Sequence, residues 1–325
     1  TPNGQTIHIR VTHNTLGCFV DRVSFDLIVN PTPAANFVED LEVCDNLAGG
    51  SAQDGIADGI DLTVQTAGIL GSQDPAVFSV SYHLSFNDAI NGTNAIANPT
   101  SYQNSTGPVE LIHIRVLNNT TGCANGISNF NLIVHPEPTT EAFVPEPYCD
   151  NDDDGDDTNG IIQNIDLNSF IPEILGPGQD EDDYTVTFHR TQAAAQSGFG
   201  ALTTPHSNND APFFQDIFVR IVNDDTGCVN DDFSFQLVVN SLPDFTVTSP
   251  QIVCLNGPEL TLFAENPQGI YDYTWTDPNG NETFGSQLVV TAGGTYKVVG
   301  RATDGTGCER EYDIVVNESI IATLT

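Results

Sequence analysis

IHIRVLNNTTGCANGISNFNLIV, residues 112–134, contains two runs in which apolar and polar residues alternate, joined by a polar turn that ends in Gly-Cys. Alternation with a period of two places successive side chains on opposite faces of a strand, so this stretch predicts a β-hairpin. The chain repeats it as IHIRVTHNTLGCFVDRVSFDLIV at 7–29, as IFVRIVNDDTGCVNDDFSFQLVV at 217–239 and, more loosely, as YKVVGRATDGTGCEREYDIVV at 296–316. Four copies of one hairpin indicate an array of similar domains.

The cysteines give the length of the repeat. Six of the seven form two series with a spacing of 105 residues: Cys18, Cys123 and Cys228, and Cys44, Cys149 and Cys254. A unit of this length can bury a core of its own, whereas the shorter units of a solenoid cannot. The sequence therefore predicts an all-β chain of tandem immunoglobulin-like β-sandwich domains with a repeat of about 105 residues.

The hairpin copies divide the chain into four parts. We expect residues 1–33 to be the C-terminal hairpin of a truncated repeat, 34–137 and 138–243 to be complete repeats, and 244–325 to be a shorter domain of the PKD or immunoglobulin type. Within 138–243 the pattern predicts a strand at Tyr184–His189 and one helical turn at Thr191–Gln196 that stops at Gly198. Since the sequence contains no Met and no signal peptide, we expect it to be a piece of a longer protein.

The charge of the chain excludes two classes of partner. There are 44 acidic and 8 basic residues, giving a formal net charge of -36. Nucleic acids and anionic membranes are bound through Lys and Arg, so neither is an expected partner. No apolar run is long enough to cross a bilayer, and we expect no membrane insertion within these residues.

The regular cysteines predict disulfides and hence an oxidising compartment. Two sets of pairs fit the period. Pairing within domains gives Cys44–Cys123, Cys149–Cys228 and Cys254–Cys308, and pairing across junctions gives Cys18–Cys44, Cys123–Cys149 and Cys228–Cys254. We favour the first set because, if the first cysteine lies near the entry end of its domain, the hairpin turn of the same domain lies at that end too.

One loop has the pattern of a calcium site. The segment CDNDDDGDDTNG, 149–160, places carboxylates at alternate positions before a Gly, as calcium loops do. The candidate ligands are Asp150, Asp152, Asp154 and Asp156, with Asp166 as a closing ligand. The twelfth position is Ile161, so the loop is not an EF-hand, and a solvated acidic loop is the alternative. The matching loop of 34–137 lacks most of these carboxylates.

No catalytic signature is present in the sequence. GxSxG, HExxH, P-loop and dinucleotide-binding patterns are all missing. We therefore predict that these residues are not an enzyme.

Several segments resemble a known class of repeats. CDNDDDG at 149–155, TVTFHRTQAAAQSGFGALTTP at 185–205 and IFVRIVNDDTGC at 217–228 resemble the tandem repeats of very large surface and secreted proteins of the Bacteroidetes. These proteins include SprB-type gliding-motility adhesins and other type IX secretion substrates. YTWTDPNG at 273–280 and GTYKVVGRATDGTGC at 294–308 resemble their PKD or immunoglobulin-like repeats.

The resemblance implies a location and a role. It implies a non-enzymatic segment of a large cell-surface adhesin or filament outside the outer membrane, acting in attachment or gliding motility. The expected partner is extracellular or on a cell surface, with polysaccharides and abiotic surfaces as candidates. The alternatives are an accessory or spacer module of a secreted polysaccharide-degrading enzyme and a generic structural spacer.

Overall fold

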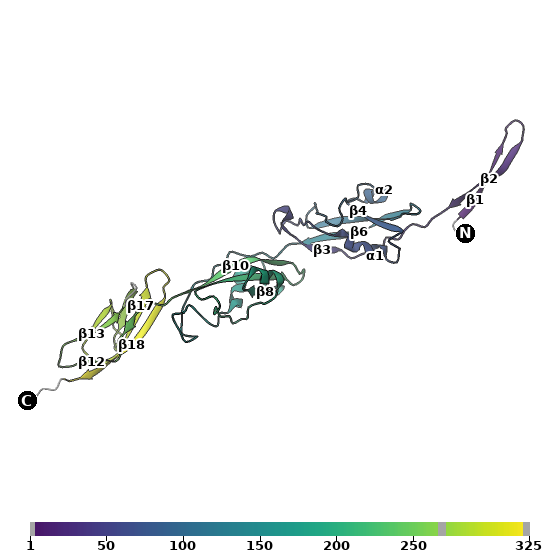
Figure 1. Cartoon of the computed structure of the whole chain (residues 1–325). Coiled ribbons are helices and arrows are strands. Elements are labelled where there is room, and N and C mark those ends of the chain that lie inside the picture. The colour runs from purple at the N-terminus through teal and green to yellow at the C-terminus, as the bar shows by residue number, and fades with distance from the viewer. Residues whose placement is uncertain (1–3, 266–270, 321–325) are drawn as a thin grey trace, which may run out of the picture. The chain divides into compact units, whose positions relative to one another are not determined.

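A computed structural model of the chain describes residues 4–265 and 271–320 (Figure 1). These residues form two compact units. The first contains the described residues up to Pro138 together with Asn223–Val229, and the second contains Thr139–Val222 and the described residues from Asn230 onwards. Parts of the predicted domains 1–33 and 244–325, namely 1–3, 266–270 and 321–325, lie outside the described residues. No helix in the described part is long and apolar enough to span a membrane.

The first hairpin is present where the sequence predicts it. Strands β1 (Gly4–Thr12) and β2 (Phe19–Ile28) pair antiparallel, with a register shift between Ile9 and Val11. Phe25 and Leu27, which alternate along β2, are half exposed. The hairpin therefore forms a two-stranded sheet with no core beneath it in the described residues.

The next domain contains a four-stranded sheet. Strands β3 (Leu41–Cys44), β4 (Phe78–His83), β5 (Val109–Asn118) and β6 (Ala124–His135) lie in the order β3-β6-β5-β4. Strand β3 runs parallel to β6, while β5 runs antiparallel to both of its neighbours. The β5–β6 turn forms because Asn118 Oδ1 accepts hydrogen bonds from the backbone N–H groups of Thr120 and Thr121.

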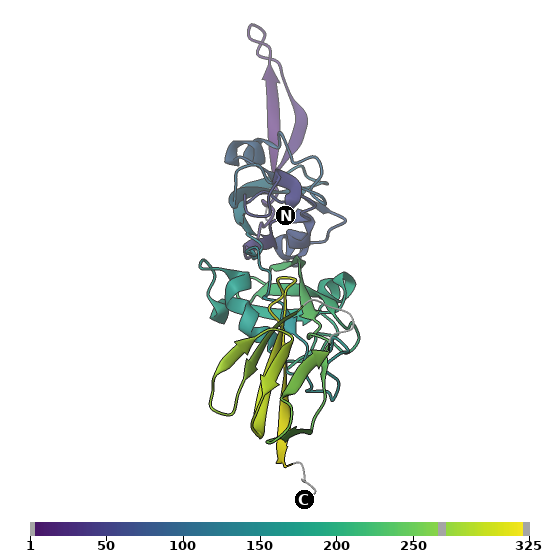
Figure 2. The ribbon, with the colours of Figure 1, turned by 90° about the vertical axis from the view of Figure 1, so that its left-hand side faces the viewer.

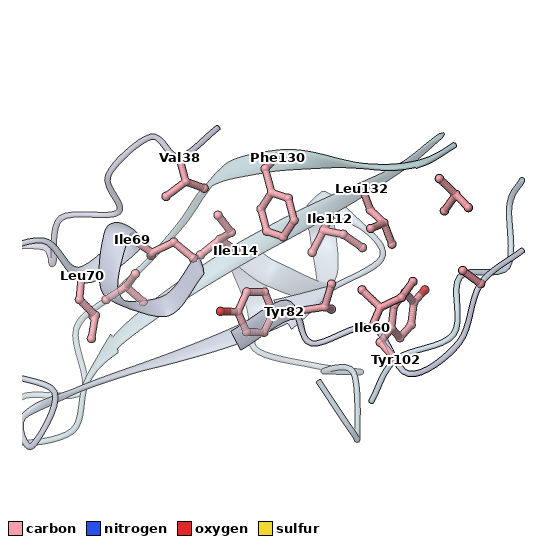
Figure 3. Close-up of a cluster of buried hydrophobic side chains, with 14 residues drawn as sticks. Val38, Ile60, Ile69, Leu70, Tyr82, Tyr102, Ile112, Ile114, Phe130 and Leu132 are labelled. Carbon is pink, nitrogen blue, oxygen red and sulfur yellow. The ribbon is translucent and has the colours of Figure 1, made fainter. Parts of the chain in front are cut away.

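Short helices and loops cover the inner face of this sheet. They comprise η1 (Leu47–Gly49), η2 (Leu62–Gln65), α1 (Thr66–Leu70) and α2 (Phe86–Asn91). Asp61 caps η2 and Ser85 caps α2 through their side-chain oxygens. Figure 3 shows Ile69 on the helical turn facing Ile114 of the sheet, and both side chains are fully buried. This domain thus buries the apolar face of its hairpin under its own connecting segments.

The second unit begins with a domain of the same construction. Its elements are β7 (Tyr148–Cys149), η3 (Leu167–Phe170), α3 (Ile171–Leu175), η4 (Glu181–Asp183), β8 (Tyr184–His189), α4 (Gln192–Ser197), β9 (Phe214–Asn223) and β10 (Val229–Asn240). The strand order is β7-β10-β9-β8, as in the preceding domain. The predicted helical turn is α4, which Thr191 caps and which ends at Gly198 with a left-handed φ of 71°.

The last domain is a two-sheet sandwich (Figure 2). One sheet contains β11 (Thr246–Val247), β13 (Leu260–Glu265) and β16 (Gln287–Val290). The other has the order β12 (Gln251–Cys254), β18 (Glu309–Ser319), β17 (Gly294–Ala302), β14 (Tyr271–Thr276) and β15 (Glu282–Phe284). Leu262 of the first sheet and Trp275 of the second belong to one buried core, and the Trp275 indole N–H donates to Gly285 O at 2.8 Å. The prediction of an all-β chain of tandem immunoglobulin-like domains is confirmed.

Candidate functional site: the disulfide junctions and their loops

Two disulfides join segments that are remote in the sequence. Cys44, at the end of β3, is bonded to Cys228 in the β9–β10 turn, with the Cα atoms 5.5 Å apart. Cys149, at the end of β7, is bonded to Cys308 in the β17–β18 turn, with the Cα atoms 5.6 Å apart. Both separations lie within the ordinary range for disulfides. Each bond links the first strand of one domain to the hairpin turn of the domain that follows.

The pairs predicted from the sequence are wrong. Neither Cys44–Cys123, Cys149–Cys228 and Cys254–Cys308 nor the alternative set across junctions is found. The prediction placed Cys44 beside the turn of its own hairpin, but β3 runs parallel to β6 and Cys44 lies opposite His135, where β6 ends. Cys123 precedes the start of β6, which is 12 residues long, so at ~3.3 Å per residue the two cysteines are about 40 Å apart.

The bonded and unbonded cysteines differ in their surroundings. Cys228 and Cys308 are completely buried. Cys18 is exposed, Cys123 and Cys254 are partly buried, and none of these three forms a disulfide with a described residue. Each disulfide joins a cysteine of a first strand to a cysteine of a hairpin turn. Among the unbonded thiols, Cys254 lies in a first strand and Cys123 lies in a hairpin turn, so both kinds of position are represented.

A buried aspartate follows the first-strand cysteines Cys44 and Cys149 and fixes the loop beyond each of them. Asp45 accepts hydrogen bonds from the N–H groups of Asn46 and Gly55, both at 2.7 Å. Asp150 does the same with Asn151 at 2.9 Å and Gly160 at 2.7 Å. Both side chains are at least 97% buried. A carboxylate with both oxygens engaged by backbone donors is a structural anchor for its loop.

Two buried asparagines complete the loop anchors. Asn104 accepts from the N–H of Ala57 at 2.7 Å and donates to the carbonyls of Gly55 and Gly107. Asn208 occupies the same place in the second repeat, accepting from Ile162 at 2.8 Å and donating to Gly160 and Ala211. Neither anchor was predicted from the sequence, although the two asparagines lie at corresponding positions of the two repeats.

Most of the candidate calcium ligands accept hydrogen bonds from nearby residues of the same loop or of the helical turn that follows it. Asp154 accepts from the N–H of Asp156 and the side-chain amide of Asn159. Asp156 accepts from the hydroxyl and the N–H of Thr158, and these hydrogen bonds lower its pKa. Asp166 caps η3, and the backbone carbonyl of Asp152 accepts from Gly155 N–H.

These carboxylates do not converge on one point. Within residues 4–265 and 271–320 no group of three or more His, Cys, Asp or Glu side chains is placed to hold a metal ion. The calcium hypothesis stays a prediction.

The acidic loop instead contacts an arginine of the last domain. Arg310 Nη2 lies 3.1 Å from Asp157 Oδ1 and donates to the Asp157 carbonyl at 3.4 Å. Nη1 of the same guanidinium donates to Tyr312 OH at 3.2 Å. The Arg310 side chain is only 11% exposed. This contact was not predicted from the sequence, because it joins residues that are 153 apart in the chain.

The comparison with protein families agrees with this arrangement. Residues 40–138 and 147–243, together more than half of the chain, match the Flavobacterium inter-domain disulphide bond domain, abbreviated FIDD. The chain belongs to the FIDD family. This is a family of the Bacteroidetes, and the two FIDD repeats are the domains that contain β3–β6 and β7–β10. No curated protein matches the chain.

Solved structures similar to this FIDD chain are tandem arrays. The four N-terminal immunoglobulin domains of Dscam1 isoform 4.4 are 11% identical, with 98% of this chain and 92% of that chain covered and a TM-score of 0.21. Human CDH23 EC21-23 is 13% identical, with 73% and 88% covered and a TM-score of 0.21. Drosophila N-cadherin EC1-4 is 11% identical, with 98% and 84% covered and a TM-score of 0.20. At these values the likeness carries no argument about ligands or partners.

Proposed function

We propose that the chain is a non-enzymatic repeat segment of a large cell-surface adhesin or surface filament, of the SprB type and exported by type IX secretion. The FIDD repeats and the two disulfides support a secreted or surface-exposed protein, because disulfides persist in oxidising compartments. The partner is extracellular, and a polysaccharide or an abiotic surface is the candidate. We also propose domain boundaries near residues 33, 137 and 243.

The observation that carries this proposal is the interlaced pair of disulfides. Cys149 lies inside the loop closed by Cys44–Cys228, and its partner Cys308 lies beyond that loop. Tension applied along the chain therefore passes through two covalent cross-links instead of through linkers alone. A cross-link of this kind limits how far a domain can be pulled out, which is a useful property in an attachment filament and has no role in catalysis.

Imaging of live cells tests the proposal. An antibody raised against these 325 residues, applied to unpermeabilised source cells, should label surface filaments and block attachment or gliding. Cells from which the coding region has been deleted are the control for specificity. Label found only in the medium, with attachment unchanged, would contradict the adhesin role.

One observation favours the accessory module of a secreted polysaccharide-degrading enzyme as a second candidate. A groove of about 690 Å³ in the last domain is lined by Tyr271, Phe284, Arg301 and Glu309, among others. Phe284 is 75% exposed, and an exposed aromatic ring beside charged side chains is suited to stacking on a sugar. Binding of soluble polysaccharides that Phe284→Ala abolishes would support this second function.

A further inference from the structure

The two disulfide junctions differ in the charge of the loop that follows the first-strand cysteine. After Cys149 six carboxylates occur within eight residues: Asp150, Asp152, Asp153, Asp154, Asp156 and Asp157. The equivalent positions after Cys44, at a spacing of 105 residues, are Asp45, Leu47, Ala48, Gly49, Ser51 and Ala52. Only the buried aspartate, Asp45 or Asp150, is common to both loops. Residues 150–157 therefore form an acidic loop, whereas residues 45–52 contain a single carboxylate.

The hairpin turns that contain Cys308 and Cys228 also differ in charge. Arg310 follows Cys308 by two residues, and Asn230 occupies this position after Cys228. The turn around Cys228 is itself acidic, with Asp224 and Asp225 before the cysteine and Asp231 and Asp232 after it. Around Cys308, Arg310 is accompanied by Asp304, Glu309 and Glu311, whereas residues 224–232 contain four carboxylates and no Lys or Arg. The difference between the two turns is therefore the presence of a cation in the turn that the acidic loop meets.

The contact between Asp157 and Arg310 is direct and partly shielded from water. The guanidinium contacts both the carboxylate and the backbone carbonyl of Asp157, and its other terminal nitrogen donates to Tyr312. With Arg310 11% exposed and Asp157 36% exposed, solvent and salt screen this pair less than a pair on the open surface.

We propose that the acidic loop 150–157 is a recognition surface that selects the hairpin turn of the following domain, with Arg310 as the residue that it recognises. Attraction between Asp157 and Arg310 brings Cys308 to Cys149, while repulsion from the acidic Cys228 turn disfavours a Cys149–Cys228 bond. Both thiols then lose a proton and together transfer two electrons to a small-molecule disulfide, which is reduced to two thiols. The loop thereby determines which domains become linked.

Oxidative refolding of the full chain tests this selection. The reduced, unfolded protein is refolded in a mixture of reduced and oxidised glutathione, remaining thiols are alkylated, and the linked peptides are measured by mass spectrometry. In Arg310→Glu we expect the yield of Cys149–Cys308, relative to Cys44–Cys228 in the same sample, to fall by about fivefold. The Cys149–Cys228 peptide should rise correspondingly.

Two variants complete the design. The double variant Asp157→Arg with Arg310→Glu reverses the pair and should restore most of the ratio. Arg301→Glu removes the same charge from an exposed ion pair with Glu309 on the neighbouring strand and should leave the ratio unchanged. An unchanged ratio in Arg310→Glu would overturn the proposal, and so would an equal loss of both linkages, because Arg310 would then act on folding in general.

Discussion

Cys44 and Cys228 are bonded with their Cα atoms 5.5 Å apart, although 184 residues separate them in the chain. The loop that they close contains Cys149, which is bonded outside the loop to Cys308. The two loops therefore overlap and share the residues between Cys149 and Cys228. The two disulfides are therefore interlaced, and the extension that they allow under tension can be calculated from their positions in the sequence.

The first prediction concerns the cysteine inventory. Digestion without reductant should release one peptide pair that joins Cys44 to Cys228 and one that joins Cys149 to Cys308. In the unfolded, unreduced protein, three thiols should react with a maleimide, namely Cys18, Cys123 and Cys254. The fully reduced protein, with seven reactive thiols, is the control. A peptide joining Cys44 to Cys123 would contradict the structure.

A second prediction concerns stretching of single molecules. With both bonds intact, about 80 residues of chain connect Cys44 to Cys308 by the shortest covalent path, which limits the extension between them to about 270 Å. After reduction, all of the intervening chain becomes available and the limit rises to about 900 Å. Force spectroscopy before and after addition of a thiol reductant measures this difference.

The matched control for stretching is a chain with all four bonded cysteines replaced by Ser. Its contour length should equal that of the reduced protein and should not respond to reductant. If the unreduced native chain already reached the longer extension, the interlaced bonds would be absent in solution.

The sequence predicts the repeat and its hairpins because alternation and cysteine spacing are local signals. The hairpin at 112–134 appears as β5 and β6 with the predicted apolar face inward, Ile112 and Phe130 among the buried side chains. The pairing of cysteines is not local. It depends on the parallel addition of β3 to β6, which moves Cys44 to the far end of its domain, and no local pattern specifies that choice.

The candidate site was predicted less completely than the fold, for a related reason. Alternating carboxylates after Cys149 are compatible both with a cation site and with a series of Asx turns, and in the structure local N–H donors satisfy several of them. The role of Asp150 as an anchor could have been found by comparing repeats, since Asp45 is present where the other carboxylates are missing. The contact between Asp157 and Arg310 could not be predicted in this way, because Arg310 belongs to a different domain and its position relative to the loop is not a local property of the sequence.

A third prediction separates the anchoring role of Asp150 from calcium binding. Asp150→Asn should lower the free energy of unfolding of the second FIDD repeat by about 1–3 kcal/mol, because an amide retains only one acceptor for the two N–H groups that the carboxylate satisfies. The loss should be equal in calcium and in chelator. Asp45→Asn in the first repeat is the matched control and should have a similar effect.

The same melting experiments test the calcium hypothesis. If the loop binds calcium, addition of the ion should raise the melting temperature of the second repeat more than that of the first. Asp152→Asn and Asp154→Asn should then reduce this shift. Identical melting curves in calcium and chelator would remove the hypothesis.

The fourth prediction concerns pH and a histidine pair of the first FIDD repeat, in which His83 is fully buried and His113 is partly buried. His113 lies opposite His83 on adjacent strands, and its Nδ1 is buried without a hydrogen-bond partner among the described residues. Burial, and to a lesser extent His83, lower the pKa of His113 below its usual value of 6.5. The unfolded chain therefore binds more protons than the folded one once the pH falls to about 6.5, so the stability contributed by this histidine is present above that pH and is lost on acidification.

Hydrogen exchange provides the local measurement of this pH effect. After correction for the intrinsic exchange rate, peptides from β4 and β5 should lose protection as the pH falls from about 7.5 to about 5.5. His113→Phe, which introduces the residue found at the equivalent position 218, should weaken this dependence. The last domain, 244–325, contains no histidine and serves as an internal control. Equal loss of protection in wild type and His113→Phe would show that a group other than His113 controls the response.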